Sequence, residues 1–375
     1  MRNSKFKIPA SLLRHLSEVP EDRPVVVLMR HSVRDRLPSG KGAYTAPITE
    51  IGKSLSAELG ALLGTRLKSI RTSPLRRCIE TGEYMVQGAG RQIPLVQSHL
   101  LGDPGPFVND GTLASTNWES LGHNKVMESI SSSDQILPGM ADGDFAARFA
   151  AKRLLSDLSS ESGFHVSITH DSVIGAMVSR LCGKHLTKED WPHFLEAAFL
   201  WQDADMVHLM YRQYRAEIHL NKLLTLTEET VRELGKRLVG MTVGYSCSAR
   251  FFIAGGVFKT LLTGKKPRDV DFWPTSLKDR ESLIACLLTK GAIHVQDGIY
   301  NDVFNIRDLT VEVAKKCEPD TLEKRLKRFD IALSAIGVEF TPEGNWDVRM
   351  HPLAKKSIEE KRILLLKPLV NWKHS

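Results

Sequence analysis

Histidine and arginine side chains gather in three short strings of the first half of the chain. The strings are RHSVR at 30–34, SPLRRCIET at 73–81 and a His-Asp pair at 170–171. Guanidinium groups bind phosphate oxygens through paired hydrogen bonds, and a neutral imidazole is a nucleophile. The residue types therefore predict a site for a phosphate ester. Its candidate residues are Arg30, His31, Arg34, Arg77, His170 and Asp171.

Glycines and carboxylates form a second group further along the chain. Gly255 and Gly256 follow the apolar residues 251–254, and such a turn lets backbone amides approach phosphates. Asp269 and Asp271 are two residues apart, so both carboxylates would project from one face of a strand. Paired carboxylates suit divalent cations that bridge a triphosphate. This pattern favours a metal and nucleotide site.

Apolar runs and helical spacing predict the elements that position the first group. Residues 24–29 and 164–169 are expected to be strands, and 49–63 and 172–181 helices. Strands that alternate with helices indicate an α/β fold, here a doubly wound and mainly parallel sheet. Ligands bind beyond the carboxyl ends of such strands. The two histidines are therefore expected to meet.

A change of pattern near residue 224 predicts a second domain. Thr225 to Glu228 has the form of a capping box, which would open a helix to about Leu238. Another strand, turn and helix are expected from Arg250 onward. We therefore predict domains at 1–224 and 225–375, the second of the α+β class.

Composition narrows the setting of the protein. The chain has 375 residues, 42% hydrophobic and 25% charged, which is typical of a soluble protein of two domains. The sequence shows no signal-like segment. Its apolar runs are all shorter than the about 20 residues that a helix needs to span a bilayer. The five cysteines lack CxxC spacing. These features predict a cytoplasmic protein without a membrane partner, and the net charge of +7 suits anionic ligands.

The first three strings are similar to those of the histidine phosphatase superfamily, over about residues 22–220. The HD pair resembles the acid-phosphatase branch, and Ser32 stands where the family has glycine. The resemblance implies a metal-free reaction through a phosphohistidine on His31. Asp171 would protonate the leaving group, while Asp103, in a Gly-Asp-Pro-Gly turn, is either another acid or a turn residue. The charge of the transferred group would be stabilised by Arg30, Arg34, Arg77 and His170.

Residues 255–271 resemble the GGxVRDxLLGxxxxDxD string of nucleotidyltransferases of the poly(A)-polymerase and CCA-adding type, and the resemblance covers about residues 235–365. It implies Mg²⁺ or Mn²⁺ on Asp269, Asp271 and a third carboxylate, for which Glu312 is the candidate. The candidate nucleotide-binding residues are Gly255, Gly256, Lys259, Arg268, Arg328 and Asp330.

Together these patterns predict a bifunctional enzyme, a phosphatase joined to a metal-dependent nucleotidyltransferase. Its expected partners are an NTP and either a phosphorylated small molecule or an RNA end. Two alternatives stay open: the phosphatase-like half could be only a phospho-ligand binding module, or the chain could be a toxin-like transferase that modifies tRNA. The nucleotide, the acceptor and the oligomeric state are not indicated by the sequence.

Overall fold

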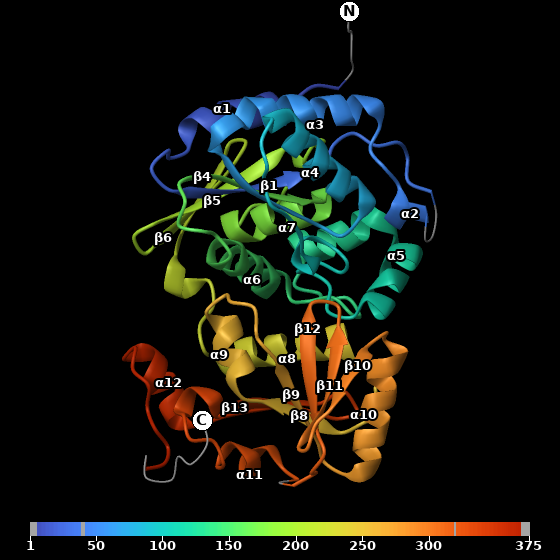
Figure 1. Cartoon of the computed structure of the whole chain (residues 1–375), viewed down its shortest axis with the longest axis vertical. Coiled ribbons are helices and arrows are strands. Elements are labelled where there is room, and N and C mark those ends of the chain that lie inside the picture. Colours follow the sequence, from blue (N-terminus) through green and yellow to red (C-terminus); the bar gives the residue numbers. More distant parts are fainter. Residues whose placement is uncertain (1–5, 39–41, 319, 369–375) are drawn as a thin grey trace, which may run out of the picture. The chain divides into compact units, whose positions relative to one another are not determined.

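The protein is described by a computed structural model that covers residues 6–38, 42–318 and 320–368 (Figure 1). The chain forms two compact units, one of residues up to Val108 with Ser115–Leu223, the other of Asn109–Ala114 with residues from Leu224 onward. The change after Leu223 lies beside the predicted boundary. Residues 109–114, however, were expected in the first domain. They belong to the second unit, where Asp110 accepts a hydrogen bond from the Tyr245 amide at 2.9 Å and pairs with Lys290 at 3.4 Å.

The first unit is built on a seven-stranded sheet in the order β3-β2-β4-β1-β5-β6-β7. Strands β1 to β4 pair in parallel, whereas β5, β6 and β7 are antiparallel. The sheet is therefore mixed rather than mainly parallel, because two-residue turns with positive φ at Ala204 and Arg212 turn the chain straight back. The strands are β1 Pro24–Arg30, β2 Leu67–Thr72, β3 Leu95–Gln97, β4 Gly163–Thr169, β5 Ala197–Asp203, β6 Met206–Tyr211 and β7 Tyr214–His219.

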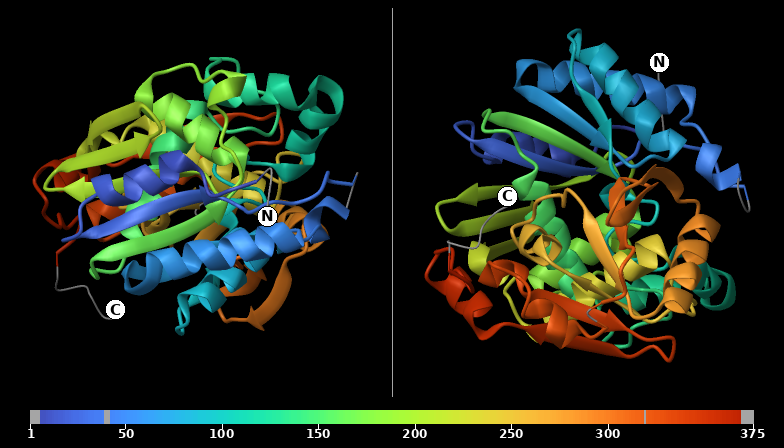
Figure 2. Two further views of the ribbon diagram at one scale, coloured as in Figure 1. Left: turned by 90° about the horizontal axis from the view of Figure 1, so that it is seen from above. Right: turned by 60° about the horizontal axis from the view of Figure 1, so that its bottom comes forward.

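Helices cover both faces of this sheet (Figure 2). Side chains of α1, α3 and α4 share one core with Val25, Val27 and Met29 of β1. Helix α7 contacts β1, β5, β6 and β7 and packs on α6. The α-helices before residue 223 are α1 Ala10–Glu18, α2 Gly42–Thr45, α3 Glu50–Leu63, α4 Arg76–Ala89, α5 Gly111–Ser131, α6 Gly143–Ser156 and α7 Asp171–Cys182. Shorter 3-10 helices are Gly64–Arg66, His99–Leu101, Lys188–Asp190 and Leu220–Lys222.

The second unit has its own seven-stranded sheet, in the order β10-β11-β12-β9-β8-β13-β14. Only the neighbours β9 and β12 run parallel, and the other neighbouring pairs are antiparallel. The strands are β8 Phe251–Ala254, β9 Val270–Pro274, β10 Ile293–Asp297, β11 Asn301–Ile306, β12 Leu309–Ala314, β13 Ile336–Phe340 and β14 Trp346–Met350. The helices are α8 Glu228–Thr242, α9 Gly256–Leu262, α10 Leu277–Thr289, α11 Leu322–Leu326 and α12 Pro352–Glu359, with a 3-10 turn at Ala332–Ser334.

The first helix of this unit differs from its prediction at both ends. The N-cap of α8 is Thr227, whose side chain accepts from the Thr230 amide at 3.1 Å, so the predicted capping box at Thr225 is wrong. The helix also continues to Thr242. Gly240 lies within α8 and does not end it. A Cβ there would lie 2.5 Å from the Asn109 carbonyl oxygen, so the helix packs closely against residue 109 at this glycine.

Across the described residues, the helices are too short or too polar to cross a membrane.

Candidate functional sites

The first site lies at the carboxyl ends of β1 and β4. These strands are parallel neighbours with Arg30 opposite Thr169, and the His31 amide donates to the Thr169 carbonyl at 3.0 Å. His170 follows Thr169, so both histidines leave the sheet at the same edge. Their ring centroids are 5.6 Å apart, edge to face. The topology thus brings together residues that are far apart in the chain.

The imidazole of His31 is oriented by a backbone contact. Its Nδ1 lies 2.8 Å from the Ser32 carbonyl oxygen, and because a carbonyl can only accept, Nδ1 carries the hydrogen and Nε2 keeps its lone pair. The residue is 2% exposed. Burial, followed by the charges of His170 and Arg77, holds the pKa of His31 well below its usual value. His31 is therefore a neutral imidazole with one nucleophilic nitrogen.

Three arginines around this imidazole have unused donors. In the described part of the chain, the buried Nε atoms of Arg30, Arg34 and Arg77 have no hydrogen-bond partner. Other guanidinium nitrogens are held by carbonyl oxygens, that of Pro192 for Arg30 at 2.7 Å and that of Ala43 for Arg77 at 2.8 Å. Burial lowers the pKa of all three arginines. A buried donor without a partner costs about 1–3 kcal/mol, so a bound anion would relieve the cluster.

His170 is held between an arginine and a loop. Arg77 Nη2 lies 3.3 Å from His170 Nδ1, and burial, then the Arg77 charge, lowers the pKa of His170 to about 3. Gly102 has φ 151°, and a Cβ there would lie 2.6 Å from Ser73 Oγ and 2.7 Å from His170 Nε2. The Gly-Asp-Pro-Gly turn therefore lies directly against this histidine.

Two carboxyl groups lie near the cluster. Asp171 Oδ2 is 2.8 Å from Arg30 Nη2. Asp103 Oδ1 accepts a hydrogen bond from the Tyr44 hydroxyl at 2.7 Å. Asp171 of the His-Asp pair and Asp103 of the loop therefore both lie at the site.

Ser32 stands where the resembled family has glycine, and its side chain is turned away from the reactive nitrogen. The hydroxyl donates to the Gly52 carbonyl on α3 at 2.8 Å, and the Ser32 amide donates to Thr81 Oγ1 at 3.0 Å. The residue is fully buried. The extra hydroxyl is therefore used in joining the catalytic loop to α3.

The second site centres on two neighbouring parallel strands. Asp271 of β9 and Glu312 of β12 are register partners, so their side chains emerge on the same face. Burial, then the charges of Asp269 and Glu312, raises the pKa of Asp271 to about 7. Asp269 precedes β9 instead of lying within it. The three predicted carboxylates are near enough to repel one another.

Two of these carboxylates are engaged with other side chains. Asp269 pairs with Arg268 at 2.7 Å. Glu312 accepts a hydrogen bond from the side-chain amide nitrogen, Nδ2, of Asn301. As they stand, no three His, Cys, Asp or Glu side chains of the described residues form a group that could hold a metal ion.

The Gly255–Gly256 turn lies against the Asp271 carboxylate. Gly255 has φ 122°, which favours glycine, and a Cβ there would come within 3.2 Å of Asp271 Oδ2. The Gly255 amide donates to the Ile336 carbonyl at 3.1 Å. Gly256 begins α9 and has open space at its Cβ position. The turn and the acidic pair thus form one face.

The other residues predicted to bind the nucleotide do not contribute side chains to this face. Lys259 is exposed on α9, and the side chain of Arg268 is 94% exposed. Arg328 is exposed too, and Asp330 pairs with Lys367 at 3.0 Å. Their roles in nucleotide binding stay predictions, because a bound nucleotide would have to bring these side chains to the site.

Arg325 is a basic residue whose charge acts on Asp271, and the sequence analysis missed it. Its guanidinium lies 3.4 Å from the centre of the Trp273 ring, and its buried Nε has no partner in the described chain. Burial lowers the pKa of Arg325 to about 10, although the Asp271 charge opposes this. The only signal was an arginine three residues before Arg328 in the sequence.

Comparison of the sequence with protein-family models finds no match. Comparison with curated proteins finds no significant match either.

Solved structures with weak overall similarity fall into two groups. A tRNA-processing enzyme in an apo form is 24% identical over 38% of this chain and 37% of that one, with TM-score 0.29. A tRNA nucleotidyltransferase complexed with a primer tRNA and an incoming ATP analog is 22% identical over 37% and 39%, with TM-score 0.28. YhfR of Bacillus stearothermophilus is 20% identical over 50% of this chain and 96% of that one, with TM-score 0.35.

The chain thus spans less than two fifths of the length of the tRNA-processing enzyme. Because TM-scores this low identify no function, the functional proposal depends on the side chains described above.

Proposed function

We propose that the protein is a bifunctional enzyme whose first unit hydrolyses a phosphomonoester and whose second unit transfers a nucleoside monophosphate. The observation that carries the first activity is the free Nε2 of His31 among three buried arginine Nε atoms without partners. A dianionic phosphate matches those donors in charge and geometry.

The proposed hydrolysis has two steps. His31 Nε2 attacks phosphorus, and the bond to the ester oxygen breaks as that oxygen takes a proton from Asp171 or Asp103. Water then attacks the phosphohistidine, loses a proton to the same carboxylate and releases inorganic phosphate and the free imidazole. Arg30, Arg34, Arg77 and His170 hold the transferred group throughout.

Hydrolysis of nitrophenyl phosphate tests this proposal. The wild type should hydrolyse it without added metal and in the presence of EDTA, and His31→Ala should lose at least about 10³-fold of the rate. The exposed His185→Ala, matched in chemistry, should retain it. Unchanged hydrolysis in His31→Ala would exclude the mechanism. No hydrolysis of any phosphomonoester by the wild type, together with tight phosphate binding, would favour a binding module instead.

The second activity is supported by Asp271 and Glu312 side by side next to the Gly255 turn. The donor chemistry suits a hard divalent cation, because all three candidate side chains are carboxylates. Asp269, Asp271 and Glu312 would hold Mg²⁺ or Mn²⁺, which when bound neutralises the triphosphate. Gly255 and Gly256 would take the phosphates, and Arg325 would add a positive charge.

Transfer is tested by incubating the protein with each labelled NTP and Mg²⁺. The acceptors are a metabolite mixture and, in a separate reaction, RNA with a free 3′ end. Mass spectrometry of the labelled product identifies both the nucleotide and the acceptor. Label in RNA would favour 3′-end processing, label in a small molecule would favour metabolite nucleotidylation, and no label in either would overturn the second activity.

A further inference from the structure

A pocket of about 650 Å³ opens beside Arg30 in the first unit. Its volume is in the range of small-molecule sites. Arg30 and Val33 of the RHSVR string line it, together with the chain entering α1 and the loop before β5. Neither the phosphate-binding residues nor the proposed reaction accounts for this space.

Phe194 joins the pocket to the reactive histidine. Its ring is among the pocket walls, and the Arg30 guanidinium lies over it at 4.3 Å. The centroid of the same ring is 5.7 Å from that of His31. A phosphate held at His31 would therefore have its ester oxygen near the mouth of this pocket.

Beyond Phe194, the pocket wall has aromatic and apolar side chains next to polar and charged ones. Phe6 meets Phe194 edge to face, with ring centroids 6.1 Å apart, and Pro9 and Val33 add apolar surface. Two rings at an angle favour a flat ring placed against them, since aromatic pairs prefer offset and edge contacts.

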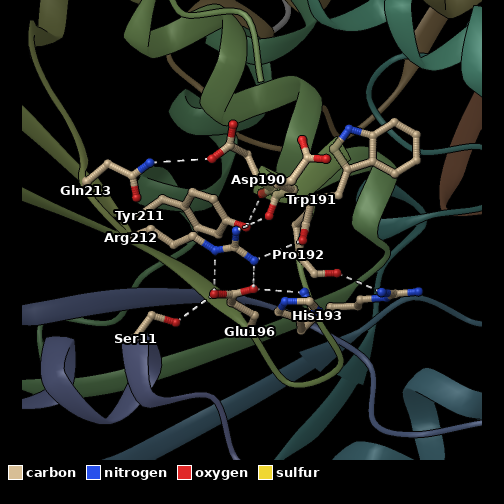
Figure 3. A network of polar contacts seen from close by, with 11 residues as sticks. Ser11, Asp190, Trp191, Pro192, His193, Glu196, Tyr211, Arg212 and Gln213 are labelled. Atoms are coloured by element: carbon tan, nitrogen blue, oxygen red, sulfur yellow. Dashed lines mark hydrogen bonds and ion pairs between the residues drawn. The ribbon is translucent and has the colours of Figure 1, made fainter. Parts of the chain in front are cut away.

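The one buried acid of the pocket is already neutralised. Glu196, 2% exposed, accepts hydrogen bonds from Arg212 at 2.6 and 2.8 Å, from Ser11 at 2.6 Å and from the His193 amide at 2.8 Å (Figure 3). Arg212 also donates to the carbonyls of residues 189 and 191 at 2.6 and 3.0 Å. This network fixes the loop that carries Phe194. Glu196 therefore does not repel an anion.

We infer that this pocket binds a planar aromatic ring in the alcohol part of the substrate, so that the phosphomonoester is nucleotide-like and not a simple sugar phosphate. The inference rests on the proposed hydrolysis at His31 for its orientation. Lys7, which also lines the pocket, adds a positive charge suited to an anionic ligand.

Adenosine 5′-monophosphate and ribose 5-phosphate test this inference, because both lose phosphate from the same kind of alcohol. The wild type should show kcat/KM about tenfold or more higher for the ring-bearing substrate. Phe6→Ala, a change at an exposed side chain, should remove most of that ratio. Leu13→Ala, at an exposed apolar residue of α1 outside the pocket, should keep it.

Calorimetric binding of the same two compounds to His31→Ala separates the pocket from the reaction. A preference for the ring-bearing compound that Phe6→Ala abolishes supports the pocket, even when the wild type hydrolyses neither, in which case only the proposed hydrolysis fails. Equal binding, no binding, or a preference that survives Phe6→Ala would overturn the inference. The last result would place the nucleotide elsewhere in the chain.

Discussion

Glu312 is the register partner of Asp271 on the adjacent parallel strand. Parallel partners point to the same side of a sheet, so the two carboxylates share one face at which the Gly255 turn also arrives. Burial and the charges of Asp269 and Glu312 raise the pKa of Asp271 to about 7, so this acidic face favours a positive partner.

Asp269→Ala and Asp271→Ala should each lower nucleotidyl transfer at least about 10³-fold, because a metal-bound triphosphate needs both carboxylates. Hydrolysis at His31 should remain unchanged, since those residues belong to the other unit. Folding should survive, because losing one of several like charges relieves repulsion. Transfer and hydrolysis are measured on the same preparations, with the exposed Asp308→Ala as control. Wild-type transfer in either variant would refute this assignment.

Asp171→Asn should slow hydrolysis of a sugar phosphate far more than that of nitrophenyl phosphate, because only an alkoxide needs a proton in the transition state. The expected difference is about tenfold or more in kcat/KM. Asp103→Asn is the matched comparison, since that carboxyl lies on the loop beside His170. If Asp103→Asn discriminates between the substrates and Asp171→Asn does not, the acid is Asp103 and the Arg30–Asp171 pair is structural.

Ser32→Ala should leave kcat for nitrophenyl phosphate within about twofold, because the hydroxyl points to the Gly52 carbonyl and not to the substrate side. Loss of this buried hydrogen bond should cost about 1 kcal/mol of unfolding free energy. Ser32→Gly should cost somewhat more, owing to backbone entropy. Denaturant unfolding and steady-state rates check both parts. A gain of activity well beyond twofold in Ser32→Gly would mean that the side chain hinders the reaction.

The first unit should lose stability on acidification through its buried histidines. The folded-state pKa of His170, about 3, lies below its ordinary value of 6.5, so between these values the unfolded chain binds more protons. Stability is therefore full above about pH 6.5 and falls as the pH drops toward 3. Thermal melts between pH 7.5 and 5 should show a smaller decrease of Tm in His170→Asn than in the wild type. An identical pH slope in both proteins would contradict the buried, neutral state.

Several features of this protein follow from short stretches of sequence. The apolar residues of β1 and β4 are enough to predict strands, and the residues just after them, His31 and His170, then have a predictable place at the strand ends. The Gly255 turn follows equally from an apolar run and two glycines. In each case the information is local, because backbone propensity and side-chain alternation act over a few residues.

Other features depended on contacts between distant residues. The place of Glu312 beside Asp271 is a matter of strand register. Arg325 lies on α11 and stacks on Trp273 of β9, whereas Arg328 follows that helix and is exposed. The antiparallel strands β5–β7 and the membership of residues 109–114 in the second unit were likewise decided by long-range packing. The pocket at Phe194 needs four separate segments of the chain to meet. A pattern within one segment does not predict contacts with distant segments, because the free energy that favours those contacts is gained only when the whole core packs.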